Sequence, residues 1–113
     1  MNNESMLTYV TTIDGTQYTV LVGQNRHDNW RLIDDADPTD IWFHASGSSS
    51  AHVFLHAPAD GIVPPSVVQF CSEKTKHRDT VYTPVGNIRK GKHIGEAIIV
   101  DAKLLRRATL GAR

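Results

Sequence analysis

The sequence has little cysteine, no long apolar run and no excess charge of either sign. Cys71 is the one cysteine among 113 residues, so the chain cannot form an internal disulfide, which favours a reducing compartment. No apolar run approaches the roughly 20 residues that a membrane-spanning helix needs. The first residues, MNNESMLTY, include neither a basic region nor an apolar stretch, so we expect no secretory signal. We therefore expect one cytoplasmic domain, residues 1–113, with no membrane segment.

The zero net charge conceals two halves of opposite sign. Residues 1–66 contain two basic and eight acidic side chains, whereas residues 67–113 contain ten basic and four acidic ones, giving net charges of −6 and +6. This asymmetry permits a basic face on a neutral molecule, which would suit a polyanionic partner. The two halves could equally pair with each other inside the fold.

Turn residues and hydrophobic periodicity predict most of the secondary structure. Two runs rich in Thr, Tyr and Val flank Asp14 and Gly15, a strong two-residue turn signal, so residues 7–23 should form a hairpin. Pro64 or Pro65 suits the first turn of a helix that Ser66 could cap. The other predictions are a short helix in residues 25–35, strands in residues 41–45, 52–57, 80–84 and 94–101, a basic loop in residues 87–93, and a helical turn or frayed end in residues 103–113.

These elements predict an α+β fold: a single small domain with a mixed or antiparallel β-sheet and one principal helix from about Pro65 to His77. Because successive residues of a strand point to opposite faces, one of Trp42 and Phe43 should be buried. The rest of the expected core is Val53, Leu55, Phe70, Ile98 and Val100, with Trp30, Leu32 and Ile33 turned inward from the short helix.

Three histidines in the stretch DIWFHASGSSSAHVFLH, Asp40 to His56, raise the possibility of a metalloenzyme. His44, His52 and His56 could together leave an open coordination position on a metal ion. However, residues four apart on a strand have Cα atoms roughly 13 Å apart, so His52 and His56 cannot both bind one ion without a bend. We therefore predict no metal and no cofactor.

A nucleophilic enzyme is the second possibility. Ser48, Ser49 and Ser50 lie near two histidines, and Asp40 could orient one of them. No GxSxG nucleophile elbow is present, and a catalytic triad is defined by geometry rather than by co-occurrence. Cys71 precedes His77 by six residues, which is too far round a helix for a dependable pair. We therefore predict that the protein is not an enzyme.

Nucleic-acid binding would use more of these residues. Small hydroxyls and backbone amides of a Gly/Ser loop suit phosphates, exposed Trp and His can stack on unpaired bases, and the segments KTKHR and NIRKGKH supply positive charge. Gly91 would let loop amides approach a phosphate. Alternatively, the basic residues could form only a solvated surface, and His52 could be a structural core residue. The candidate residues, which we expect to converge beside the loop from Ser48 to His52, are Trp42, His44, Ser49, Ser50, His52, Lys74, Lys76, Arg78, Arg89, Lys90, Lys92 and His93.

Taken in order, the segments resemble the NFACT-R domain. DIWFHASGSSSAHVFLH resembles the signature of that family, which starts Asp-x-Trp-Phe-His and ends Ser-Ser-x-His-Val. VGQNRHDNWRL resembles its upstream segment, and VVQFCSEKTKHRDTVYTPVGNIRKGKHIGEAIIV resembles its helix, Val-x-Tyr-Thr strand, basic loop and closing strand. The resemblance implies an RNA-binding module linked to ribosome-associated quality control or translation. It implies tRNA or rRNA as the partner, with DNA possible, and a ribosomal or quality-control protein as a further partner.

The sequence also departs from the family. Val85 stands where eukaryotic relatives tend to have Trp, and residues 1–113 contain neither an NFACT-N companion domain nor a heptad run. We therefore do not expect this chain to recruit tRNA for nascent-chain extension. The alternative from another class is a non-catalytic adaptor that docks on a ribosome-bound partner through apolar surface. Neutralising its basic residues would leave partner binding nearly intact.

Overall fold

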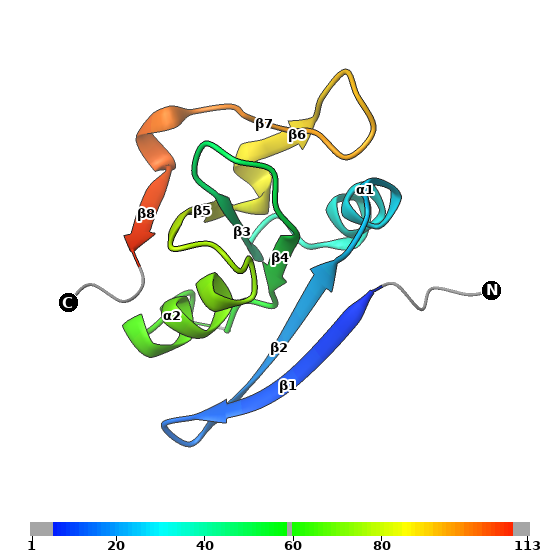
Figure 1. The fold of residues 1–113 in the computed structure, drawn as a ribbon. Helices are drawn as coiled ribbons and strands as arrows, with labels where there is room; N and C mark the ends of the chain where they lie inside the picture. Colours follow the sequence, from blue (N-terminus) through cyan, green and yellow to red (C-terminus); the bar gives the residue numbers. More distant parts are fainter. Residues whose placement is uncertain (1–5, 59, 110–113) are drawn as a thin grey trace.

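Six antiparallel strands form the centre of the domain in a computed structural model that describes residues 6–58 and 60–109 (Figure 1). Every neighbouring pair in this sheet is antiparallel, and the predicted α+β class is confirmed. The strands are, from edge to edge, β1 (Leu7–Ile13), β2 (Thr16–Gly23), β4 (His52–Leu55), β3 (Ile41–Ala45), β5 (Asp79–Pro84) and β8 (Arg106–Thr109). The other elements are helices α1 (Arg26–Asp35) and α2 (Pro65–Glu73), the two-stranded sheet β6 (Ile88–Lys90) and β7 (Ala97–Ile99), and the 3-10 turns η1 (Val85–Asn87) and η2 (Ala102–Leu104).

The two helices lie on either side of β3 and β4, so the central strands have a hydrophobic core on both faces (Figure 1). Val67 of α2 packs in one core with Phe43, and Leu32 of α1 packs in the other with Trp42. Trp42 is 3% exposed and Phe43 is 0% exposed, so both alternating residues of β3 are core. Full burial of each such side chain stabilises the fold by about 1.5–3 kcal/mol.

The hairpin and the first helix agree with the sequence signals. β1 and β2 turn at Asp14 and Gly15, and the Asn25 side chain accepts a hydrogen bond from the Asp28 amide (2.8 Å) at the start of α1. The helix has ten residues and lies within the predicted range of residues 25–35. Leu32 is buried as predicted, whereas Trp30 and Ile33 are half-buried.

Helix α2 is shorter than predicted, ending at Glu73 rather than near His77. Lys76 adopts a left-handed φ of 64°, which a helix cannot contain, so the basic segment forms a turn after the helix. The predicted cap by Ser66 is wrong: Pro64 occupies the capping position and no side chain caps α2. Within the described residues, neither α1 nor α2 nor any other helix has the length and apolar character needed to cross a membrane.

The last third of the chain differs most from the prediction. The expected loop at residues 87–93 is wrong, because η1 and β6 occupy most of it, and the expected strand at residues 94–101 is reduced to β7. Val100 is 62% exposed and therefore not core, whereas Ile98 and Phe70 are half-buried. The C-terminal segment forms β8, an edge strand paired with β5, and residues 110–113 lie outside the described residues.

Candidate nucleic-acid interface

A groove of about 600 Å³ lies beside the loop between β3 and β4. The start of α1 forms part of its wall, and the segment between β6 and β7 forms another part. We call it the histidine groove. Its lining residues are Arg26, Asn29, Trp42, His44, Gly47, Ser48, Ser49, Ser50, His52, Ile94, Gly95, Glu96 and Ala97.

Three rings of the DIWFH…H motif pack together in this groove. The Trp42 Nε1–H donates a hydrogen bond to His52 Nδ1 (3.0 Å), and the His44 ring stacks on Trp42 with centroids 5.5 Å apart and planes at 12°. The His44 and His52 rings meet edge to face at 4.8 Å. Because Trp42 is 3% exposed and His52 is 4% exposed, the prediction that Trp42 offers an open face to a base is wrong.

Both histidines are neutral at neutral pH, and their hydrogen bonds fix where each proton lies. Burial lowers the pKa of His52 to about 3, with a smaller contribution from His44. Burial also lowers the pKa of His44, although its bond to the Ala45 carbonyl opposes the shift. Trp42 can only donate, so His52 Nδ1 accepts and its proton sits on Nε2. The Ala45 carbonyl can only accept, so His44 carries its proton on Nδ1 and has a free lone pair on Nε2.

The low pKa of His52 predicts a loss of stability in acid. Its folded pKa of about 3 lies below the 6.5 that is ordinary for a histidine, so between these pH values the unfolded chain binds a proton that the folded chain does not. Stability from this residue is therefore complete above pH 6.5 and falls as the pH decreases, by about 2 kcal/mol at pH 5. We expect His52→Gln, whose side-chain oxygen can still accept the Trp42 N–H, to flatten the stability difference between pH 7 and pH 5 in urea unfolding. The exposed-site control His27→Gln should keep the parent pH dependence, and equal pH dependence in His52→Gln and the parent would contradict the assignment.

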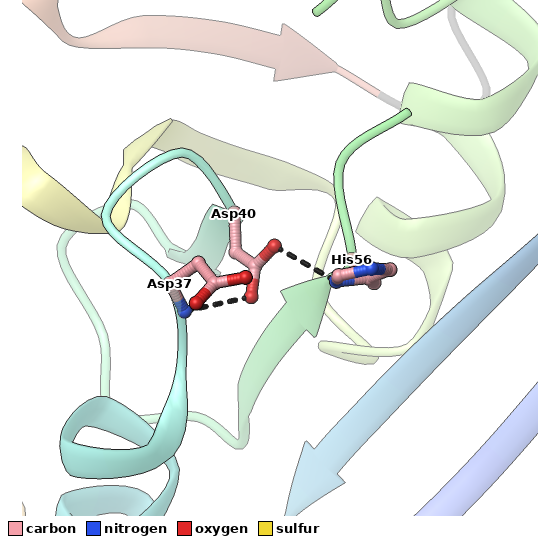
Figure 2. Close-up of side chains that lie close together, drawn as sticks. All are labelled: Asp37, Asp40 and His56. Carbon is pink, nitrogen blue, oxygen red and sulfur yellow. Dashed lines mark hydrogen bonds and ion pairs between the residues drawn. The ribbon is translucent and has the colours of Figure 1, made fainter. Parts of the chain in front are cut away.

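His56 does not join the other two histidines, so the predicted alternative of a three-histidine metal site is not assembled. His52 opens β4 and His56 follows its other end, where His56 Nδ1 lies 3.1 Å from Asp40 Oδ1 (Figure 2). The Ala57 amide donates to the same oxygen (3.1 Å), and the Asp37 amide donates to Asp40 Oδ2 (3.0 Å). The Asp40 carboxylate therefore links the start of β3 to the end of β4 through hydrogen bonds, and we call it a clasp.

The clasp is also a group of metal-ligand types, because ligand atoms of Asp37, Asp40 and His56 lie within 4.8 Å of one another (Figure 2). Both Asp40 oxygens already accept backbone hydrogen bonds, which accounts for a carboxylate that is 8% exposed. The arrangement is thus explained by backbone hydrogen bonding alone.

Two of the candidate nucleophiles, Cys71 and Ser50, are buried or hydrogen-bonded, whereas Ser48 and Ser49 are exposed. Burial raises the pKa of the Cys71 thiol to about 12, so almost no thiolate exists at neutral pH. Ser50 Oγ accepts a hydrogen bond from the Ala45 amide (3.0 Å) and donates one to the Ala51 carbonyl (2.9 Å). Ser50 therefore shapes the loop, whereas Ser49 is exposed on it.

A second groove, of about 620 Å³, also borders this loop. We call it the lysine groove, because Lys74 and Lys76 from the end of α2 line it. The Lys74 Nζ lies 4.3 Å from the Tyr9 ring centroid and 4.5 Å from that of Phe70, two cation–π contacts that orient it. The two grooves adjoin, sharing the lining residues Arg26, Asn29, Ser49 and Ser50.

The second basic segment was predicted to converge beside the loop from Ser48 to His52, but its charged side chains do not line the grooves; the residues that follow it, Ile94 to Ala97, line the histidine groove instead. Arg89, Lys90, Lys92 and His93 line neither groove, and neither does Arg78. The Lys90 Nζ instead lies 2.8 Å from Asp34 Oδ1 of α1. The predicted site residues that line one or both grooves are Lys74, Lys76, Trp42, His44, Ser49, Ser50 and His52, and the other five line neither.

The loop amides near Gly91 contact a side chain of the protein itself. Lys92 and His93 donate their amides to Glu96 Oε1 (3.0 and 3.2 Å). A Cβ on Gly91 would overlap the Glu96 side chain. Glycine leaves room here for the Glu96 carboxylate, and the prediction that these amides meet a phosphate is not supported by their geometry.

Sequence reasoning missed Arg26, which lines both grooves at the start of α1. Gly95 packs against it with a left-handed φ of 93°, and a Cβ there would overlap Arg26. The available signal was the capping Asn25, because it places the next residue at the positive end of a helix. Arg107 of β8, also missed, reaches the same loop through Ser46 Oγ (3.3 Å).

Asn29, on the next turn of α1, was also missed. Its side chain is 7% exposed, and Oδ1 is buried without a hydrogen-bond partner among the described residues. Leaving such an acceptor unpaired costs about 1–3 kcal/mol. Asn29 lines both grooves, and its Oδ1 is packed against Gly23.

An antiparallel sheet covered by helices, with adjoining histidine and lysine grooves, defines a small α+β domain. The family model described as the NFACT protein RNA binding domain matches residues 6–100, so the chain belongs to the NFACT-R family. The resemblance in the motifs is thereby confirmed.

Curated relatives carry the name coiled-coil domain-containing protein 25. The Bos taurus protein is 32% identical over 100 residues, which cover 75% of this chain and 48% of that protein. The Dictyostelium discoideum homolog is 30% identical over 108 residues, covering 82% of this chain and 52% of that protein. The chain thus spans about half the length of these relatives.

A solved structure shares the fold. The C-terminal part of the fibronectin/fibrinogen-binding protein from Streptococcus suis superposes with a TM-score of 0.74 at 20% identity. The match covers 96% of this chain and 47% of that one. At this identity the likeness concerns the fold alone.

Proposed function

We propose that this domain binds RNA without catalysing a reaction, and that the adjoining histidine and lysine grooves are its binding surface. The observation that supports this most is the convergence of Arg26, Lys74 and Lys76 on the loop that carries Ser49. Cations beside small hydroxyls suit the phosphates of a nucleic-acid backbone. The family description as an RNA-binding domain supports RNA over DNA.

We further propose tRNA or rRNA as the target, in the cytoplasm, with a role in translation or ribosome-associated quality control. The motif resemblance motivates this proposal. Fluorescence anisotropy of the purified domain with a labelled tRNA, an rRNA stem-loop and a DNA of equal length tests the binding. Affinity for RNA that falls as salt rises supports the proposal. Absent or salt-independent binding contradicts it.

A protein-docking function is the second candidate, and one apolar region favours it. Leu104 is 52% exposed and lines a cavity of about 350 Å³ with Ile41, Val63 and Pro84. A ribosome-bound protein partner could dock there through apolar contacts. In that case, substituting the cations of the two grooves would leave partner binding unchanged.

A further inference from the structure

We infer that the histidine groove takes the base of one unpaired nucleotide and that His44 and His52 bind its hydrogen-bonding edge, an inference that rests on the RNA binding proposed above. A cavity of about 600 Å³ is within the size range of small-ligand sites. The centroids of the two rings lie 4.8 Å apart, and both residues line the groove.

The two histidines present one acceptor and one donor. His44 is held with its lone pair on Nε2 by the bond to the Ala45 carbonyl, and His52 is held with its proton on Nε2 by Trp42. Every nucleobase has a donor beside an acceptor on its Watson–Crick edge; in uracil these are N3–H and a carbonyl oxygen. That edge is occupied in a duplex, so only an unpaired base can bind this way.

Asn29 provides a further group that needs a partner. Asn29 is only 7% exposed, and its Oδ1 has no hydrogen-bond partner among the described residues. Native proteins seldom leave such a group unsatisfied, and exceptions often mark functional sites. The terminal amide torsion has a broad, roughly two-fold profile, so rotation would turn a polar atom toward a bound base.

The phosphate of the same nucleotide has a place at the start of α1. Arg26 occupies the first position of this ten-residue helix, whose dipole favours an anion and whose first turn also contains Asp28. Because Arg26 also lines the lysine groove, the strand would continue from there toward Lys74 and Lys76. Successive nucleotides of one strand would thus occupy the histidine groove, through a base, and the lysine groove, through a phosphate.

The test uses two single-stranded RNA ligands of equal length and charge: a uridine decamer and the same decamer made of N3-methyluridine. Methylation removes the N3–H donor that His44 would accept and leaves every phosphate unchanged. We expect the parent protein to bind the methylated decamer about tenfold more weakly, the effect of one lost hydrogen bond. His44→Phe keeps a flat ring on Trp42 and should bind both decamers equally, with the weaker affinity.

A second variant separates base binding from folding. Asn29→Ala removes the unpaired acceptor, so it should weaken binding of the uridine decamer without lowering the melting temperature. Equal affinity of the parent for both decamers overturns the inference while leaving RNA binding intact. Absence of binding to either decamer and to tRNA overturns the proposed function itself. A loss of melting temperature in Asn29→Ala with unchanged affinity would show that Asn29 is structural and remove it from the site.

Discussion

Removing the positive charges of Arg26, Lys74 and Lys76 should weaken RNA binding roughly 100-fold at 0.1 M salt, if each contacts one phosphate of a single strand. These three side chains line the adjoining grooves, whereas most other cations lie elsewhere. Each lost contact should reduce the slope of log affinity against log salt by about 0.7, so the triple variant should lose about 2 units. Glutamine is the suitable replacement, because the aliphatic part of Lys74 packs beside Tyr9 and Phe70.

The matched control removes the same charge outside the grooves. Arg89, Lys90 and Lys92 line neither groove, and Lys90 is already paired with Asp34. Their triple glutamine variant should therefore keep most of the affinity and of the salt slope. Equal losses in the two triple variants would mean that net charge, rather than the grooves, governs binding.

Replacing Asp40 with alanine should destabilise the domain by about 3 kcal/mol, because two backbone amides and one histidine lose their acceptor. For a domain of this size, that corresponds to a fall in melting temperature of roughly 12 °C. RNA affinity, measured well below the melting temperature, should not change, since Asp40 lines neither groove. Thermal unfolding by circular dichroism measures the effect.

Asp37→Ala is the control that distinguishes a clasp from a metal site. Asp37 contributes its amide to the Asp40 carboxylate, and substituting its side chain leaves that amide in place. If Asp40 is a clasp, Asp37→Ala should leave stability within about 0.5 kcal/mol of the parent, as for an ordinary surface substitution. A comparable loss in both variants, reversed by added zinc, would contradict the clasp.

Features with local causes were predictable from the sequence. The turn at Asp14 and Gly15, the helix start after Asn25 and the central strands around Trp42 each depend on neighbouring residues. The end of α2 was not predictable in this way, because Lys76 adopts a left-handed φ that its residue type does not indicate. Val100 was wrongly predicted to be a core residue, because an apolar run does not reveal that β7 pairs outside the main sheet.

Part of the candidate site was also predictable, because some of its residues are close together in the sequence. Residues within the motif, such as His44 and His52, are neighbours on paired strands, so the sequence could bring them together. Arg26 and Glu96 are seventy positions apart along the chain and share a groove only because Gly95 packs on α1. The sequence also could not show that Glu96 occupies the amides of the loop after Gly91.

Mapping of ultraviolet cross-links between the purified domain and bound tRNA tests the central claim most directly, because it reports binding and its position together. Mass spectrometry of the cross-linked peptides should place RNA adducts on the segments lining the two grooves, residues 42–52 and 74–77 and the start of α1. Adducts should disappear in the variant lacking the charges of Arg26, Lys74 and Lys76. Absence of adducts, or adducts confined to residues 88–93, would contradict the account.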